Sequence, residues 1–445
     1  MSTFIITLIF CWLSWRYIYP PLALLLFVFI DPVTTPGTAI IVPFGVYAIR
    51  IVWGFLLGAA LVSMIRLHRN RNDSRGGSFS WQVGVICALI VFLIRLSVVF
   101  GTEELGIEVQ YDSVGPLTLI IVLGFFRDRR AWWYIGLMFI VQLGVSLYVV
   151  TNPDSILNGY TASMADLANN GSLLSEKFAD SSIIGSRMQG QFGNPIALAM
   201  YASVAIAAGI ALFVASFRLR ANRYVYIICG ILLTICGIFL LGISSSRGIM
   251  IGLIIGIVVY FFKIRGPVRL SIISLISLIF FISLPNIFYL IQDDDPFFGR
   301  FALFADFNRT ELFRLEAINS SLNAVIQRPV FGFGSYESAL YACKGYIAHQ
   351  GPYYLSVLYG IPVGLLACLI IVQAFKSDYF LSKLKEITGD RNLAALQAFS
   401  TISFWAAMGC IMTNGYATPI LINIILGLTM WPMIIQRHPH VVSPR

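Results

Sequence analysis

The residues best suited to chemistry lie between Asn308 and Gly364, in a polar stretch followed by an apolar helix. This stretch holds several arginines, a Pro-then-Gly turn and a single histidine, His349, just before the apolar run. An imidazole can take or give a proton near neutral pH. His68, His438 and His440 stand among arginines and have the character of solvated loop and tail. His349 is therefore the candidate general base, although a histidine that is merely hydrogen-bonded at a membrane interface is the alternative.

Six arginines are candidates for binding phosphate. All are expected at one membrane face, which topology rules usually leave poor in positive charge. A guanidinium matches phosphate oxygens in bidentate geometry, so the set predicts a pocket for a lipid phosphate or pyrophosphate. Pairing with the many acidic residues of the same loops is the alternative for each arginine. For Arg50 and Arg95, snorkelling of the side chain to lipid head groups is a third option. The six are Arg50, Arg95, Arg187, Arg247, Arg309 and Arg314.

Other catalytic signatures are absent from the sequence. GxxxxGK[ST], GxSxG and HExxH do not occur, so ATP hydrolysis, a serine nucleophile elbow and a zincin site have no support. The seven cysteines include no CxxC. Asp293 to Asp295 could attract a divalent cation, but consecutive side chains diverge, and a solvated helix end explains them better. We therefore expect neither a metal nor a cofactor.

The elements that must position these residues are membrane helices. The chain of 445 residues is 58% hydrophobic and 11% charged, with mean hydropathy +0.83. Apolar runs long enough to cross a bilayer recur along its length. The fold class predicted is an all-α polytopic membrane protein with about twelve transmembrane helices. The first is a retained N-terminal segment, and the others are expected near 46–65, 81–100, 113–126, 131–150, 192–216, 224–243, 247–262, 270–291, 352–375, 393–412 and 417–436.

Basic residues give this helix array an orientation. One set of connections holds 19 Lys and Arg, and the opposite set holds eight. The positive-inside rule then puts both termini in the cytoplasm and the candidate site on the other face. Because the basic residues are spread over these short loops, the net charge of +9 does not indicate nucleic-acid binding.

Five regions follow from this reading. They are N-terminal transmembrane helices at 1–150, a first long outer loop at 151–191, central transmembrane helices at 192–291, a second long outer loop at 292–351, and C-terminal transmembrane helices with a cytoplasmic tail at 352–445. Within the second loop, Glu311 to Gln327 has apolar residues at helical spacing, and Pro329 follows. This predicts an amphipathic helix lying along the outer membrane surface.

Four motifs occur in order along the chain. Arg187 to Pro195 reads Arg-x2-Gly-x-Phe-x-Asn-Pro, and Ser246-Arg247-Gly248 reads Ser-Arg-Gly. Pro329 to Gly334 ends an arginine-led amphipathic helix, and His349-Gln350 leads to Gly360. Together they resemble the O-antigen ligase and O-antigen polymerase (Wzy_C-type) superfamily of bacterial GT-C membrane glycosyltransferases, and the O-antigen ligases most closely. Val363 departs from the ligase pattern. Arg309 and Arg314 both fit the arginine of the helix, and spacing to Pro329 favours Arg314.

The resemblance implies a function. The donor would be a glycan on undecaprenyl pyrophosphate, and the acceptor a sugar hydroxyl of lipid A–core, both in the periplasmic leaflet of the bacterial inner membrane. The arginines would neutralise the pyrophosphate without metal, and His349 would deprotonate the acceptor for an inverting transfer. A repeat-unit polymerase and a protein oligosaccharyltransferase of the same superfamily are alternatives that differ in acceptor. A lipid-linked glycan transporter is the alternative from another class.

Overall fold

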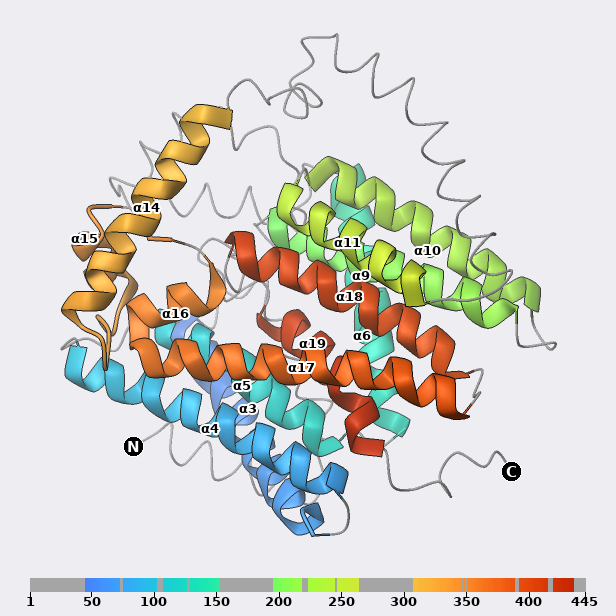
Figure 1. The fold of residues 1–445 in the computed structure, drawn as a ribbon, viewed down its shortest axis with the longest axis horizontal. Helices are drawn as coiled ribbons and strands as arrows, with labels where there is room; N and C mark the ends of the chain where they lie inside the picture. Colours follow the sequence, from blue (N-terminus) through green and yellow to red (C-terminus); the bar gives the residue numbers. More distant parts are fainter. Residues whose placement is uncertain are drawn as a thin grey trace.

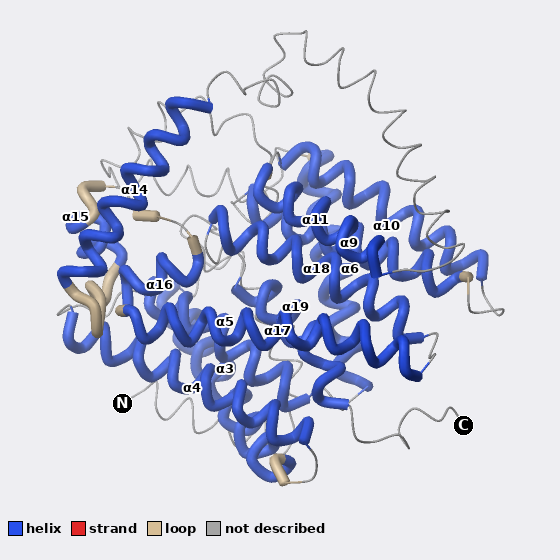
Figure 2. Tube along the Cα trace, in the orientation of Figure 1, coloured by secondary structure: helices blue, strands red, loops and turns tan. Residues whose placement is uncertain are grey.

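The computed structural model describes a bundle of helices. The residues that it describes are 45–72, 75–101, 107–125, 129–152, 195–217, 223–244, 246–263, 307–345, 347–348, 350–388, 392–414 and 419–435. Within them every regular element is a helix and no strand occurs (Figure 2). This confirms the all-α class.

In the described part of the chain, ten long helices make up the body of the bundle. All consist mainly of apolar residues, as the expected spans require. They are α3 (Gly45–Asn70), α4 (Arg75–Gly101), α5 (Ile107–Phe125), α6 (Arg129–Thr151), α9 (Pro195–Ser216), α10 (Arg223–Ser244), α11 (Arg247–Lys263), α17 (Ile361–Thr388), α18 (Asn392–Asn414) and α19 (Pro419–Ile435).

Five helical segments within the described part are long and apolar enough to cross a membrane. They are Gly77–Phe100, Pro195–Ser216, Arg223–Ser244, Ile361–Ser382 and Leu393–Met412. Shorter apolar segments occur in α5, α6, α11 and α19. The expected spans at the N-terminus and near 270–291 lie outside the described residues, as does the loop 153–194, so the number of twelve stays a prediction.

Close contacts show which helix ends lie together. On α11 and α18, Gly252 faces Gly409 while Gly256 faces Ile402, so the two helices run antiparallel. The start of α11 therefore lies beside the end of α18. A three-residue connection joins α17 to α18, which puts the start of α17 at that same end. Helix α16 (Gly351–Tyr359) directly precedes α17, so we refer to this end as the α16 end of the bundle.

Three further helices gather at the α16 end (Figure 1). They are α14 (Phe307–Gln327), α15 (Tyr336–Ala342) and α16 (Gly351–Tyr359). The helix predicted for Glu311 to Gln327 is present as the greater part of α14, and it ends two residues before Pro329. A proline cannot continue the hydrogen-bond ladder, which explains the stop.

The prediction of a single helix near 352–375 is wrong, because two helices, α16 and α17, cover this stretch. The chain breaks at Gly360, whose φ of +90° is open to glycine and strained for other residues. A β-carbon on Gly364 would overlap Ser356 Oγ and lie 2.6 Å from Pro352 O. In a continuous helix residues 352 and 364 would be about 18 Å apart. The chain therefore reverses at Gly360, and α16 folds back along the first turns of α17.

Candidate functional site

The centre of the candidate site is α16, because His349 and Gln350 precede it. His349 itself lies outside the described residues, but the residues on either side of it are placed. Gln350 is the N-cap of α16, and its side-chain Oε1 is buried without a hydrogen-bond partner among the described residues. Buried polar atoms nearly always have a partner, so this oxygen is a candidate acceptor for a substrate group.

Helix α14 holds both flanks of His349. The Ala348 N–H donates to the buried Ser321 Oγ at 2.9 Å. The Tyr353 hydroxyl donates to the Ile318 carbonyl at 2.9 Å. Burial raises the pKa of Tyr353 above its usual value, so this hydroxyl keeps its proton and remains a donor. The chain from 348 to 353 is thus tied at two points to one face of α14.

The same face of α14 includes the position of Arg314. At 100° per residue, Arg314 lies within about 40° of both Ile318 and Ser321. Arg309 lies about 120° or more from either, in register with the exposed Glu316 and Gln327. The helical register therefore puts the two arginines on different faces of α14, and it agrees with the spacing to Pro329, which favours Arg314.

The loop of residues 329–334, which contains Gly332 and Gly334, holds the other end of α16. Phe333 N–H donates to the Val357 carbonyl at 3.3 Å, and Gly334 N–H donates to the Leu358 carbonyl at 2.8 Å. Ile361 N–H donates to the Pro329 carbonyl at 2.8 Å. The last carbonyls of a helix have no partner within it, and here the loop supplies one. We call residues 329–334 the glycine clamp.

The clamp requires glycine at particular positions. Gly332 has φ +61°, and a β-carbon there would overlap the carbonyl of Leu358. A β-carbon on Gly360 would overlap the carbonyl of Val330. The Pro-x-x-Gly-x-Gly motif and the distant Gly360 are therefore two sides of one backbone contact.

Tyr359 connects α16 to the N-terminal helices. Its hydroxyl donates to Asp112 Oδ2 on α5 at 2.6 Å, and its carbonyl accepts from Ser97 Oγ on α4 at 3.0 Å. Arg95 lies close enough to the Tyr359 phenol for the two to interact electrostatically. These contacts put the end of α4 and the start of α5 at the α16 end of the bundle.

The predicted arginines can now be placed by their helices. Arg95 is near the end of α4, Arg50 is in the second turn of α3, and Arg247 opens α11. Since α3 and α4 are joined by a short connection, all three positions fall at the α16 end, as does α14 with Arg309 and Arg314. Arg187 lies outside the described residues.

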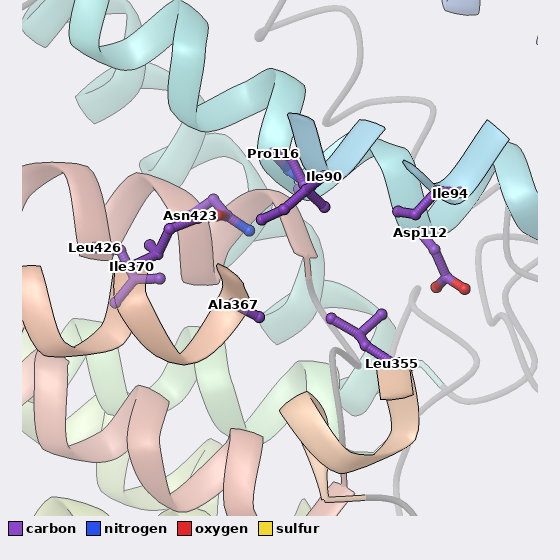
Figure 3. Close-up of a pocket in the computed structure, with 10 residues that line it drawn as sticks. Ile90, Ile94, Asp112, Pro116, Leu355, Ala367, Ile370, Asn423 and Leu426 are labelled. Atoms are coloured by element: carbon purple, nitrogen blue, oxygen red, sulfur yellow. The ribbon is translucent and has the colours of Figure 1, made fainter. Parts of the chain in front are cut away.

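A cavity lies beside Tyr359 and Asp112, between α4, α5, α16, α17 and α19 (Figure 3). Its lining is Ile90, Ile94, Asp112, Gly115, Pro116, Leu355, Ala367, Ile370, Asn423 and Leu426. The volume open to the centre of a water molecule is ≈ 20 Å³, so the cavity can hold about one water. The lining has a carboxylate and no basic side chain, so this cavity does not suit a pyrophosphate.

Cys343 is not a reactive thiol, and no metal site is found in the described part of the chain. Burial raises the pKa of the Cys343 thiol, which donates to Ser321 Oγ at 3.8 Å, so it stays protonated and is a poor nucleophile. Within the residues that the structure describes, no group of three or more His, Cys, Asp or Glu side chains could hold a metal ion.

The central part of the chain, from α10 into α17, matches a known family. Residues 232–368 match the Wzy_C family, O-antigen ligase. This match supports the resemblance to the O-antigen ligase and polymerase superfamily. It contains three of the four motifs, and Arg187 to Pro195 lies before it. A search of curated proteins found no match.

The matched segment contains the glycine clamp, α14 and α16, together with Arg247, Arg309, Arg314 and His349. Members of this family are glycosyltransferase-like ligases and polymerases, which supports an enzyme role in the membrane. Sequence reasoning missed Tyr359, Asp112 and Ser97. Two of these partners lie outside the family segment, and a single polar residue in an apolar run shows no spacing pattern.

Proposed function

We propose that the protein is an O-antigen ligase. It would transfer a glycan from undecaprenyl pyrophosphate to a sugar hydroxyl of lipid A–core at the periplasmic face of the inner membrane. The observation that supports the proposal is that the matched family segment ties down the residues on either side of His349. Its two flanks are bonded to the α14 face that bears Arg314 in register, and the clamp fixes the far end of α16.

The transfer balances with groups of this chain alone. His349 takes the proton of the acceptor hydroxyl while that oxygen bonds to the anomeric carbon. The bond from that carbon to the pyrophosphate oxygen breaks, with inversion, and the electron pair leaves on the pyrophosphate. Gln350 Oε1, which is buried and has no partner among the described residues, accepts a hydrogen bond from the acceptor sugar and orients it.

The arginines stabilise the leaving group. Arg314 is the first candidate for binding the pyrophosphate, because it is in register with Ile318 and Ser321. Arg247 and Arg187 are the next candidates, because they belong to family motifs. Arg309 is the weaker alternative on the same helix. Arg50 and Arg95 come from helices outside the matched segment, and the electrostatic interaction of Arg95 with Tyr359 favours a structural use for Arg95. Guanidinium groups placed before the reaction can neutralise the developing charge without a metal ion.

The test is transfer by the purified protein from lipid-linked donor to rough lipopolysaccharide in the presence of EDTA. We expect capped lipopolysaccharide from the natural protein and none from His349→Ala, which should keep its expression level and thermal stability. Near-full turnover by His349→Ala would reject the base, and loss of activity in EDTA would reject the metal-free reaction. Extension of the lipid-linked glycan, with no transfer to lipopolysaccharide, would identify a polymerase instead. Movement of the donor without product would identify a transporter.

A further inference from the structure

Helix α14 has three faces rather than two. Ala317, Ser321, Ala324 and Val325 form a buried face packed toward α15 and α16. Glu316, Asn319, Asn323 and Gln327 form an exposed polar face. Between them lie Leu322 and Ile326, which are 48% and 67% exposed. An ordinary surface helix has one apolar stripe, which faces the core. The second stripe has no partner within the described part of the chain.

The exposed stripe continues beyond the helix. Val330, in the glycine clamp, is 55% exposed. The ring centroid of its neighbour Phe331 lies 4.8 Å from the ring centroid of Phe100. Phe100 and Val99 are themselves 65% and 71% exposed, and they end the apolar segment Gly77–Phe100 of α4. The stripe therefore joins the lipid-facing surface of a membrane span. We call Leu322, Ile326 and Val330 the α14 stripe.

We propose that the α14 stripe contacts the acyl chains of the leaflet in which α4 ends. Continuity with Phe100 identifies the occupant, because the outer surface of a span at this height is covered by lipid. Arg328, which lies between Ile326 and Val330 in the chain, is exposed, and so is Lys344, which follows α15. Both could meet lipid phosphates. The buried face of α14 packs on the site, the stripe lies on lipid, and the polar face meets water.

This contact would fix the depth of the site. Ser321 and Ile318, which hold the flanks of His349, are on the same rigid helix as the stripe. A helix that rests on acyl chains along one side and on α16 along another cannot move away from the bilayer without breaking one of the two contacts. Lipid-linked substrates would thus meet the site at a constant height. The contact itself does not depend on the reaction proposed above.

The test measures depth directly. Spin labels are placed singly at Leu322, Ile326 and Val330, and at Asn319 and Asn323 as matched controls on the same helix. The background is the full chain with its native cysteines replaced, reconstituted in phosphatidylethanolamine–phosphatidylglycerol vesicles. We expect the three stripe positions to collide several-fold more with oxygen than with a water-soluble nickel chelate, and the two controls to show the reverse. Equal nickel access at all five positions would overturn the proposal. Low access to both reagents along the stripe would also overturn it, and would indicate a second protein copy there.

A second measurement needs no substitution. The natural protein is reconstituted with a lipid that carries a photoreactive diazirine in its acyl chain, and the labelled residues are found by mass spectrometry. We expect adducts at Leu322, Ile326 and Val330 as well as at Val99 and Phe100. Labelling of Val99 and Phe100 without the stripe would contradict the proposal.

Discussion

The Tyr359 hydroxyl donates a 2.6 Å hydrogen bond to the Asp112 carboxylate, joining residues that are 247 positions apart in the chain. The two lie on α16 and α5, and Tyr359 is almost fully buried. Its backbone carbonyl accepts a further bond from Ser97. Both ends of α16 are thus held from outside the helix, one by α14 and the other by the glycine clamp together with α4 and α5.

Tyr359→Phe should lower stability by about 1.5–3 kcal/mol, the usual effect of removing a hydrogen bond to a charged group. The ring is kept, so the effect reports the hydroxyl. The thermal unfolding of the purified protein in detergent measures it. Tyr341→Phe is the matched control, because Tyr341 is 90% exposed. If both variants melt at the temperature of the natural protein, the bond to Asp112 does not stabilise α16.

Gly332→Ala and Gly360→Ala should each cause a large loss of folded protein. Each combines a positive φ with a β-carbon that would overlap a backbone carbonyl, which cannot move aside as a side chain can. Gly345→Ala separates the two effects. Gly345 has φ +87° with no atom within 4 Å of the added β-carbon, so its cost should be only about 1–2 kcal/mol. Yield of monodisperse protein on gel filtration is the measurement. Equal yields from all three variants would show that the clamp contact is not needed.

Arg314→Ala should raise the KM for the lipid-linked donor by about 10–100-fold, the effect of losing a charge-assisted hydrogen bond of 1.5–3 kcal/mol. Arg309→Ala should raise it much less, because its position lies on the polar face of α14. Transfer rates at varied donor and fixed acceptor give both values. A larger effect at Arg309 would reverse the assignment made from the helical register.

A buried ion pair at the opposite end of the bundle should be essential for stability. Lys263 Nζ on α11 donates to Asp378 Oδ2 on α17 at 2.5 Å, and Thr401 on α18 donates to Asp378 Oδ1 at 2.7 Å. The Asp378 side chain is only 3% exposed. Lys263→Met leaves that carboxylate buried without a counter-charge, at a cost of about 3–5 kcal/mol.

The thermal unfolding temperature checks this prediction. Lys376→Met, at an exposed lysine two residues before Asp378 in α17, serves as the control and should change little. The double variant Lys263→Met with Asp378→Leu should recover much of the loss, since no buried charge remains. A double variant as unstable as Lys263→Met alone would argue against the charge pair as the cause.

The sequence was sufficient to predict most of the helices because runs of about 20 apolar residues determine them. It was also sufficient for the end of α14, where Pro329 gives a local signal. It did not reveal the break at Gly360, because the residues on both sides are apolar and hydropathy is insensitive to a positive φ. Nor could it divide the apolar residues of α14 between two faces. Val325 and Ile326 are neighbours in sequence, yet one is buried and the other exposed.

The candidate site was predictable to a different degree. Family motifs identified the glycine clamp and the Arg314 helix, and both fall within the matched segment. Lys263 is one of the 19 basic residues that gave the orientation, yet it pairs with Asp378. Asp112 is one of the acidic residues that were considered only as partners of the arginines. Long-range partners such as these depend on how helices pack, which local spacing does not encode.

The bond between Tyr359 and Asp112 also limits how this enzyme can be engineered. A chimaera that grafts residues 232–368 onto the front half of another protein would separate Tyr359 from its own acceptor, Asp112, and from Ser97, which donates to its carbonyl. Transplanting α4 and α5 together with that segment would keep the joint intact. The interchangeable module is therefore discontinuous in the chain, and boundaries drawn from the family match alone would cut through it.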